Sequence, residues 1–114
     1  MRLQDILEIL DGQVVCGKEH LIDEVDRGFA SDLLSDVLTL QTNNLVLLTG
    51  LVNVQTIRTA EMADIKHIVF VRKKKASPEI IELARENNQV IIECNYSMFK
   101  AAGLLYKAGL KAIY

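Results

Sequence analysis

The sequence predicts an α/β fold, a three-layer arrangement with a mostly parallel open sheet and helices on both faces. Four short apolar runs begin 23, 22 and 20 residues apart, and each gap has room for a helix and its turns. The runs are continuous rather than alternating, as in parallel strands that are buried on both faces. They cover residues 45–48, 68–71, 90–92 and 110–113. We therefore expect residues 1–114 to form a single domain with right-handed crossovers.

The first elements along the chain are short. Apolar residues at the i, i+3, i+4, i+7 spacing predict a helix over residues 2–10 with one buried stripe. Gly12 stands where a residue in the left-handed conformation would end this helix. The mostly apolar residues 13–16 then predict a strand.

An edge strand and a second helix are predicted next. The strand covers residues 25–30. Ser31 is a good N-cap for a helix that continues through Leu40, and Asp32 would suit the positively polarised first turn. Asp36 lies one turn after Asp32, and both carboxylates are expected to face solvent.

Three further helices fill the gaps between the apolar runs. Residues 54–64 carry apolar side chains on one face. The Ser-Pro pair at 77–78 begins a helix over 78–87, because proline at the first helical position loses no hydrogen bond. Residues 97–107 form the last helix, which ends before Gly109.

Composition and charge limit the classes of function. A chain of 114 residues that is 50% hydrophobic and 25% charged is typical of one folded domain. Its net charge of -2 disfavours a dedicated nucleic-acid binder. No apolar run reaches the ~18 residues that cross a bilayer, and the charged N-terminal segment is unlike a secretory signal, so a cytoplasmic location is expected. Two cysteines cannot form a four-thiolate site within one chain, and no cofactor or metal is predicted.

The candidate ligand site is the edge at which the parallel strands end. Ligands of open α/β sheets bind there, beside the helix N-termini. The turns at 49–53, 72–77 and 93–97 meet at this edge. A glycine in the first turn and a basic run in the second predict binding of a small anionic, phosphorylated ligand. The predicted ligand-binding residues are Thr49, Gly50, Asn53, Arg72, Lys73, Lys74, Asn95 and Ser97.

Each of these turns also has a simpler interpretation. Asn53, and either Asn95 or Ser97, would serve only as N-caps. The basic residues at 72–75 would only be solvated. Cys94 would be either a buried, inert thiol or a nucleophile activated by a helix N-terminus.

Two other patterns predict no site. Residues 12–19 match the phosphate-binding loop G-x-x-x-x-G-K-[ST] except at Glu19, which replaces the hydroxyl that would meet magnesium. A helix precedes this segment and a strand occupies its middle, whereas the motif needs the opposite order. His20 and His67 are isolated in sequence and lack metal-ligand spacing with a cysteine.

Most of the chain resembles the DRTGG domain family. The resemblance covers roughly residues 25–110 and consists of hydrophobic pattern and turns. The segments that carry it are 30–38, 45–50, 68–71, 80–85 and 96–99.

The two motifs that name the family are not kept. Its Asp-Arg pair falls near Val52 and Asn53, and its Thr-Gly-Gly falls near residues 72–74, which are Arg-Lys-Lys. Residues 26–28 are Asp-Arg-Gly, but they do not lie at the position of either family motif.

The resemblance implies a non-catalytic regulatory or dimerisation module. Members resemble the N-terminal domain of HPr kinase/phosphorylase and occur in some phosphate acetyltransferases and CBS-containing pyrophosphatases. A stand-alone copy is also similar to small proteins encoded beside iron hydrogenases, some of which are labelled kinase or iron–sulfur protein. This sequence lacks a kinase phosphate loop and the thiols for a cluster.

We therefore predict a non-catalytic module that binds a small anionic ligand or a partner protein. One alternative is an enzyme that uses Cys94 as nucleophile. The other is an accessory protein of a redox, iron hydrogenase-type system, with Cys16 and Cys94 combined across a dimer.

The helix over residues 97–108 predicts a homodimer. Its only charged residues, Lys100 and Lys107, fall on one narrow stripe, so the sheet can cover only part of its apolar surface. The N-terminal helix could cover the rest, but it is expected on the opposite edge or face. Gly103 would allow two copies of the helix to approach closely. Leu105→Lys is expected to produce monomers or aggregates, and Lys107→Glu is expected to be tolerated.

Overall fold

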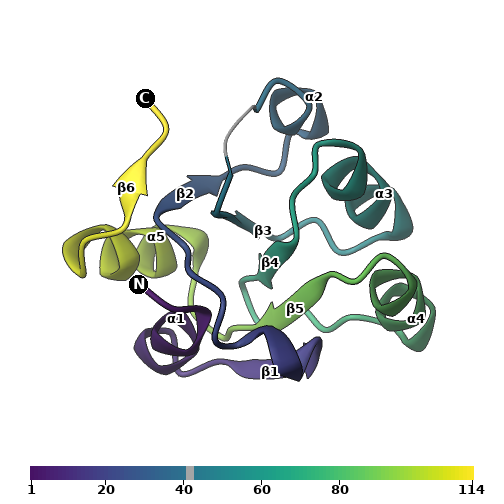
Figure 1. Cartoon of the computed structure of the whole chain (residues 1–114), viewed down its shortest axis with the longest axis horizontal. Coiled ribbons are helices and arrows are strands. Elements are labelled where there is room, and N and C mark those ends of the chain that lie inside the picture. The colour runs from purple at the N-terminus through teal and green to yellow at the C-terminus, as the bar shows by residue number, and fades with distance from the viewer. Residues whose placement is uncertain (41–42) are drawn as a thin grey trace.

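The computed structural model describes residues 1–40 and 43–114, which form three layers around one sheet (Figure 1). The sheet has six strands in the order β1-β5-β4-β3-β2-β6. β1 is antiparallel to β5, and every other neighbouring pair is parallel. The strands are β1 (Gln13–Cys16), β2 (Arg27–Ala30), β3 (Leu45–Thr49), β4 (His67–Phe70), β5 (Val90–Glu93) and β6 (Lys111–Ala112). The predicted α/β fold with a mostly parallel sheet is confirmed.

Helices cover both faces of the sheet. Figure 1 shows α1 (Leu3–Ile9) and α5 (Met98–Lys107) on its left, and α2 (Leu34–Val37), α3 (Val54–Met62) and α4 (Pro78–Glu86) on its right. A short 3-10 helix, η1 (Lys18–His20), follows β1. β2 to β5 follow one another outward across the sheet, and α5 then returns over the other face to β6.

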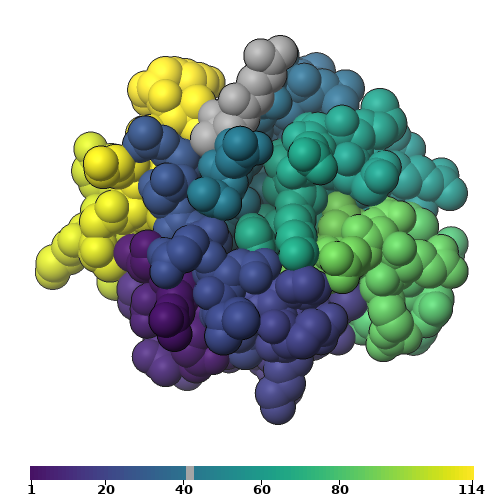
Figure 2. All heavy atoms as spheres, in the orientation of Figure 1, coloured from purple at the N-terminus to yellow at the C-terminus, as the bar shows by residue number. Residues whose placement is uncertain are grey.

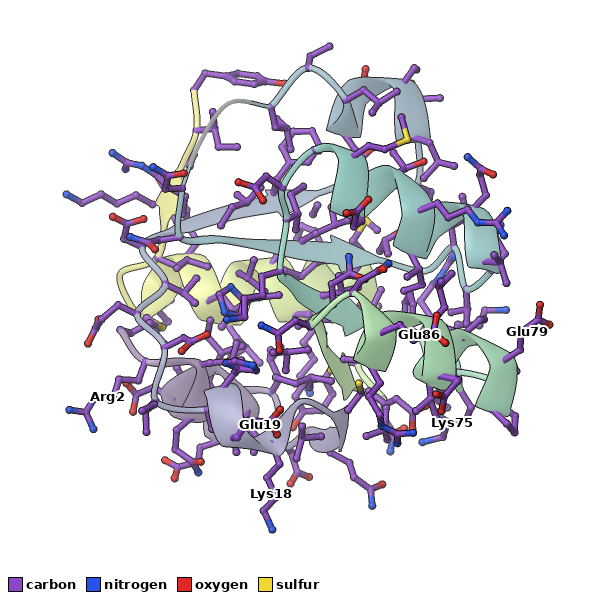
Figure 3. All side chains as sticks on the ribbon, turned by 45° about the vertical axis from the view of Figure 1, so that its right-hand side comes forward. Arg2, Lys18, Glu19, Lys75, Glu79 and Glu86 are labelled. Atoms are coloured by element: carbon purple, nitrogen blue, oxygen red, sulfur yellow. The ribbon has the colours of Figure 1, made fainter. Side chains whose placement is uncertain are left out.

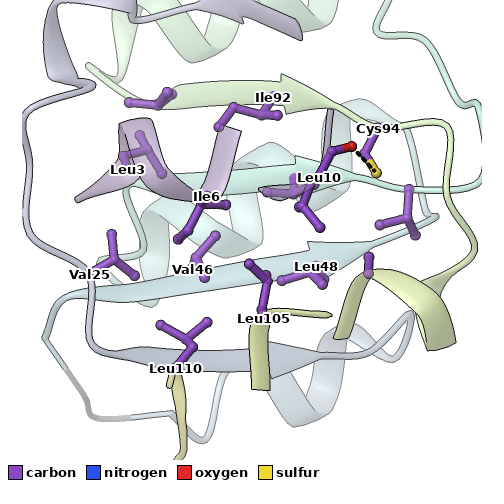
Figure 4. Close-up of a cluster of buried hydrophobic side chains, with 14 residues drawn as sticks. Leu3, Ile6, Leu10, Val25, Val46, Leu48, Ile92, Cys94, Leu105 and Leu110 are labelled. Carbon is purple, nitrogen blue, oxygen red and sulfur yellow. Dashed lines mark hydrogen bonds between the residues drawn. The ribbon is translucent and has the colours of Figure 1, made fainter. Parts of the chain in front are cut away.

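The core consists of two clusters, one on each face. Alternate residues of β3 belong to different clusters, since successive side chains of a strand point to opposite faces. Val46 and Leu48 pack with α1 and α5 (Figure 4), whereas Leu45 and Leu47 pack with the other helices. All residues of β3, β4 and β5 are buried, which explains their continuous apolar runs.

The helix predicted from Ser31 through Leu40 is wrong in its extent. α2 contains four residues, and its N-cap position is Leu33. The Ser31 hydroxyl accepts a hydrogen bond from Leu33 N at 3.0 Å, so it stabilises a local turn before the helix. This difference leaves Asp32 outside the helix.

Two further expectations about the sheet and its cover need correction. β2 is not an edge strand, because β6 pairs with Arg27 and Gly28. α1 does not lie on the face opposite α5, since the two helices share one cluster; it lies towards the β1 edge of that face, whereas α5 covers β2 and β3 (Figure 1). The N-terminal and C-terminal parts of the chain accordingly adjoin on the surface (Figure 2).

The end of α1 also differs from the prediction. Asp11 has the positive φ of 49°, and Gly12 does not have a positive φ. A Cβ at Gly12 would lie 2.8 Å from Ile92 Cγ2, so packing against β5 requires this glycine. Gly109 follows α5 with φ of 109°, as expected for a helix end.

Candidate functional site

Three helices begin at the edge where β2 to β5 end, and each has a side-chain N-cap. The Asn53 side chain accepts a hydrogen bond from Thr56 N at 2.8 Å. Ser77 Oγ accepts from Ile80 N at 3.3 Å, and Ser97 Oγ accepts from Lys100 N at 3.1 Å. Asn53 and Ser97, both predicted to bind ligand, therefore act as caps of α3 and α5.

Asp32 reaches this edge directly after β2. Its Oδ1 accepts hydrogen bonds from Thr49 Oγ1 at 2.9 Å and from Gly50 N at 2.7 Å. Its Oδ2 lies 3.1 Å from Arg72 Nη2. The prediction that Asp32 serves the first turn of a helix is wrong, because its carboxylate joins the ends of three strands, although the residue is exposed as predicted.

These contacts determine the ionisation of Asp32. Partial burial works to raise the pKa of its carboxyl group. The hydrogen bonds from Gly50 and Thr49 and the positive charge of Arg72 outweigh that effect and hold the pKa below its ordinary value of 3.8. Asp32 is therefore an anion at neutral pH.

Gly50 leaves room for the Arg72 side chain. A Cβ added at Gly50 would collide with the Arg72 guanidinium group. The glycine thus lets Arg72 lie across the end of β3, where it can reach Asp32. Both residues were predicted as part of the site from their place at the strand ends.

The basic loop at 72–75 is fixed by its backbone. Arg72 and Lys73 have φ of 64° and 62°, in the left-handed region. Arg72 N donates to Tyr96 O at 2.8 Å, and Lys73 N donates to Cys94 O at 3.2 Å, so the loop is attached to the turn after β5. The Lys73 and Lys74 side chains are exposed, as is Asn95 on the neighbouring turn.

A second carboxylate occupies the other end of this loop. Glu93 has only 7% of its surface exposed. Its Oε2 accepts a hydrogen bond from Ala76 N at 2.8 Å, and its Oε1 lies 3.6 Å from Lys75 Nζ. Asp32 and Glu93 are not among the residues predicted to bind ligand. Each lies at the carboxyl end of a strand, and that position is the signal that could have found them.

Both cysteine thiols are buried in the core. Cys94 Sγ donates to Leu10 O at 3.6 Å in the cluster that contains α1 and α5 (Figure 4). Cys16 belongs to the cluster on the other face. Burial is the main cause that raises the pKa of each thiol. A thiol of raised pKa is a poor nucleophile at neutral pH.

Comparison with known proteins identifies the family. The sequence profile of the DRTGG domain matches residues 5–108. The chain belongs to the DRTGG domain family. No curated protein matches it in sequence.

A solved structure shares the fold of this DRTGG domain. It contains the CBS and DRTGG domains of the regulatory region of Clostridium perfringens pyrophosphatase, complexed with the activator diadenosine tetraphosphate. The TM-score is 0.76 at 17% sequence identity. The similarity covers 96% of the present chain but only 47% of that chain, so the DRTGG domain spans about half of its solved relative. The resemblances to HPr kinase/phosphorylase and to proteins encoded beside hydrogenases stay predictions.

The backbone at the family's second motif suits glycine, although the side chains differ. Lys73 falls near the first glycine of Thr-Gly-Gly, and its left-handed φ is a conformation that glycine adopts without cost. This DRTGG domain therefore places cationic side chains on a turn that favours glycine. The family's Asp-Arg pair falls near Val52 and Asn53, beside the N-terminus of α3.

The segment that resembles a phosphate-binding loop lies at the other edge of the sheet. Because β1 is antiparallel to β5, Gly17 and Lys18 lie beside the amino end of β5. Lys18 is exposed and points away from Lys75 (Figure 3). The strand β1 occupies the middle of the motif, as the sequence indicated.

His20 and His67 are not isolated from each other in the fold. His67 Nε2 lies 3.0 Å from Asp23 Oδ2, and His20 Nδ1 lies 3.5 Å from the same oxygen. Lys66 Nζ also lies 3.5 Å from it. Within residues 1–40 and 43–114, no group of three or more His, Cys, Asp or Glu side chains is arranged to hold a metal ion.

The basic side chains around Asp23 predict that the stability of the protein depends on pH. Burial works to raise the pKa of Asp23, but the hydrogen bond to His67 and the nearby cationic groups outweigh it and lower the pKa. A lowered carboxyl pKa contributes stability that is present above the unfolded value and is lost as the pH falls through the folded value. Asp23→Asn is expected to reduce the free energy of unfolding by about 1–2 kcal/mol near pH 5. The difference from the unmutated protein should shrink towards pH 3.

Urea denaturation at both pH values measures this difference. Asp26→Asn is the matched control, because Asp26 is an exposed carboxylate three residues along the chain. A difference for Asp23→Asn that grows on acidification would contradict the assignment.

None of the helices that the structure describes has the length and apolar composition needed to span a membrane.

Proposed function

We propose that this DRTGG domain is a non-catalytic regulatory module that senses a small anionic ligand at the carboxyl edge of its sheet. The observation that carries the proposal is the basic loop at 72–75, which lies beside the N-terminus of α4. A helix N-terminus favours anions, and cationic side chains next to it add charge-assisted hydrogen bonds. A phosphorylated ligand is the chemical class that this arrangement suits.

The charges of the loop are only partly neutralised. Arg72 is paired with Asp32, and Lys75 is paired with Glu93. Within the part of the chain that the structure describes, no carboxylate lies within ion-pair distance of Lys73 or Lys74. These two lysines are therefore available to a ligand. They carry positive charge at this edge although the net charge of the whole chain is -2.

The regulatory role is supported by the family and by the solved relative. That relative is the regulatory region of a pyrophosphatase in complex with a dinucleoside polyphosphate activator. A polyphosphate carries the negative charge that Lys73 and Lys74 would bind. We extend the ligand class, and not the particular activator, to the present chain.

Catalysis by Cys94 is disfavoured by its environment. The thiol is 1% exposed, and its pKa is raised by burial. An iron–sulfur centre shared across a dimer is disfavoured for a similar reason. Cys16 and Cys94 are buried in clusters on opposite faces of the sheet.

A polar hollow of about 570 Å³ at the amino edge is a competing place for a ligand. Its lining includes Asp23, Glu24 and Asp64 as well as Lys66 and His67. Three carboxylates beside these basic groups disfavour an anion there. The carboxyl edge is the better candidate for a phosphorylated ligand.

We also propose that the module is a homodimer that pairs through α5. Phe99, Gly103 and Tyr106 lie one helical turn apart on the exposed side of this helix. Phe99 is 90% exposed and Tyr106 is 71% exposed, and no atom lies within 4 Å of a Cβ placed on Gly103. α1 packs beside α5 but leaves this stripe uncovered.

A thermal-shift screen tests the ligand class. ATP, diadenosine tetraphosphate and inorganic pyrophosphate are the probes, and adenosine is the control without phosphate. A compound at 100 times its dissociation constant raises the free energy of unfolding by about 2.7 kcal/mol, which is roughly 10 °C for a domain of this size. Stabilisation by adenosine to the same extent, or by none of the phosphates at millimolar concentration, would contradict the proposal.

A further inference from the structure

The Asp32 carboxylate occupies a set of donors that is also suited to a phosphate. A hydroxyl, a backbone N–H and a guanidinium group converge on it, from Thr49, Gly50 and Arg72. The same three kinds of donor bind phosphate oxygens in proteins. The chain therefore supplies an anion of its own to this site.

Two of the donors are fixed by the sheet, and the third is carried by an anchored backbone. Thr49 is 1% exposed at the end of a central strand, and Gly50 is buried directly after it. The Arg72 backbone is fixed by the hydrogen bond from its N–H to Tyr96 O. Removal of the carboxylate would leave the Thr49 hydroxyl and the Gly50 N–H in place, with the Arg72 guanidinium free to turn towards another anion.

Asp32, in contrast, has an exposed side chain. It is 40% exposed, and it follows the last hydrogen bond between β2 and β3, which Ser31 N donates to Leu48 O. The next element, α2, has only four residues. The Glu93 carboxylate also accepts a backbone hydrogen bond, from Ala76 N, but Glu93 is only 7% exposed and is part of β5. Of the two carboxylates, Asp32 is the one that an external anion can replace.

We propose that Asp32 is an internal competitor for the terminal phosphate of a polyphosphate ligand. This inference rests on the proposed function, since it describes how the same edge is regulated. While Asp32 is bound, Arg72 is neutralised and only the neighbouring lysines attract the ligand. When the ligand binds, its phosphate takes the place of the carboxylate at Thr49, Gly50 and Arg72. The affinity of the module is thus set by its own carboxylate.

The test is the affinity of Asp32→Asn for inorganic pyrophosphate, measured by titration calorimetry at neutral pH and low salt. Asparagine has the same shape and keeps an oxygen that can accept from Gly50 N, so the variant is expected to fold. Loss of the charge frees Arg72, and the affinity should increase about tenfold. Asp36→Asn is the matched control, because it removes the same charge from an exposed residue of α2. It should change the affinity less than twofold.

A double variant separates competition from general electrostatics. In Asp32→Asn combined with Arg72→Gln, the gain should disappear, because it depends on the freed guanidinium. The proposal is supported if Asp32→Asn binds pyrophosphate more tightly than both the unmutated protein and the double variant. It is also supported if Asp32→Asn is the one protein of the three that binds pyrophosphate.

The contrary outcomes are distinct from one another. Equal or weaker binding by Asp32→Asn, while the unmutated protein binds, overturns the competitor but leaves the proposed function. Absence of pyrophosphate binding by both proteins overturns the competitor and the phosphate site together.

Discussion

Leu105→Lys is expected to abolish folding, whereas Tyr106→Glu, one residue later, should leave the fold intact and produce a monomer. Leu105 is 1% exposed and packs in the core with α1 and the sheet (Figure 4). A lysine there would place a charge in an apolar cluster, at a cost of about 4 kcal/mol or more. Such a cost approaches the lower end of the free energy of unfolding of native domains, which is about 5–15 kcal/mol. The prediction that Leu105 lies at the dimer contact is therefore wrong, and aggregation of Leu105→Lys would report unfolding and not the loss of a dimer.

Light scattering after size exclusion, together with circular dichroism, distinguishes the two variants. The unmutated protein should have a mass near 25.6 kDa, twice the 12.8 kDa of the chain. Tyr106→Glu should give a folded species of 12.8 kDa. Lys107→Glu is the control for a change of charge on α5 and should remain dimeric. A monomeric unmutated protein at micromolar concentration would refute the dimer.

Replacement of Lys73 by Gly together with Lys74 by Ala should weaken binding of a phosphorylated ligand about 30-fold. Each exposed lysine contributes about 1 kcal/mol to the interaction, and about 2 kcal/mol corresponds to that ratio of dissociation constants. The glycine is chosen because φ of 62° strains a lysine by about 1 kcal/mol. The variant should therefore be at least as stable as the unmutated protein.

Lys18→Ala is the matched control for this change. It removes a lysine from the opposite edge of the sheet, in the segment that resembles a phosphate-binding loop. Titration with ATP should give the same dissociation constant as for the unmutated protein. If Lys18→Ala loses binding while the Lys73 and Lys74 variant keeps it, the ligand binds beside the amino end of β5, which would contradict our proposal.

The central part of the fold was predictable because its strands are buried on both faces. Such strands leave continuous apolar runs, and the caps at Asn53, Ser77 and Ser97 mark the helices between them. The segment from Ser31 to Leu40 was not predictable in the same way. Its local capping pattern favours a helix, but the carboxylate of Asp32 forms stronger contacts with the end of β3.

The candidate site was predicted in its place but not in its contacts. The rule for parallel sheets selected the turns that contain Gly50 and Arg72. It could not show that Asp32, 40 residues before Arg72 in sequence, contacts both of them. For the same reason, His20 and His67 were interpreted as isolated although both contact Asp23. Local sequence patterns carry no information on such long-range pairs.

The most direct test of the account is a nuclear magnetic resonance titration of the ¹⁵N-labelled protein with ATP. Saturable chemical-shift changes are expected for the backbone amides of Gly50 and of residues 72–76, at the carboxyl edge of the sheet. The amides of Gly17 and Lys18 at the opposite edge, and of Asn44 and His67 beside the polar hollow, should not change. Changes confined to those four amides, or no saturable change anywhere, would contradict a phosphate site at the carboxyl edge.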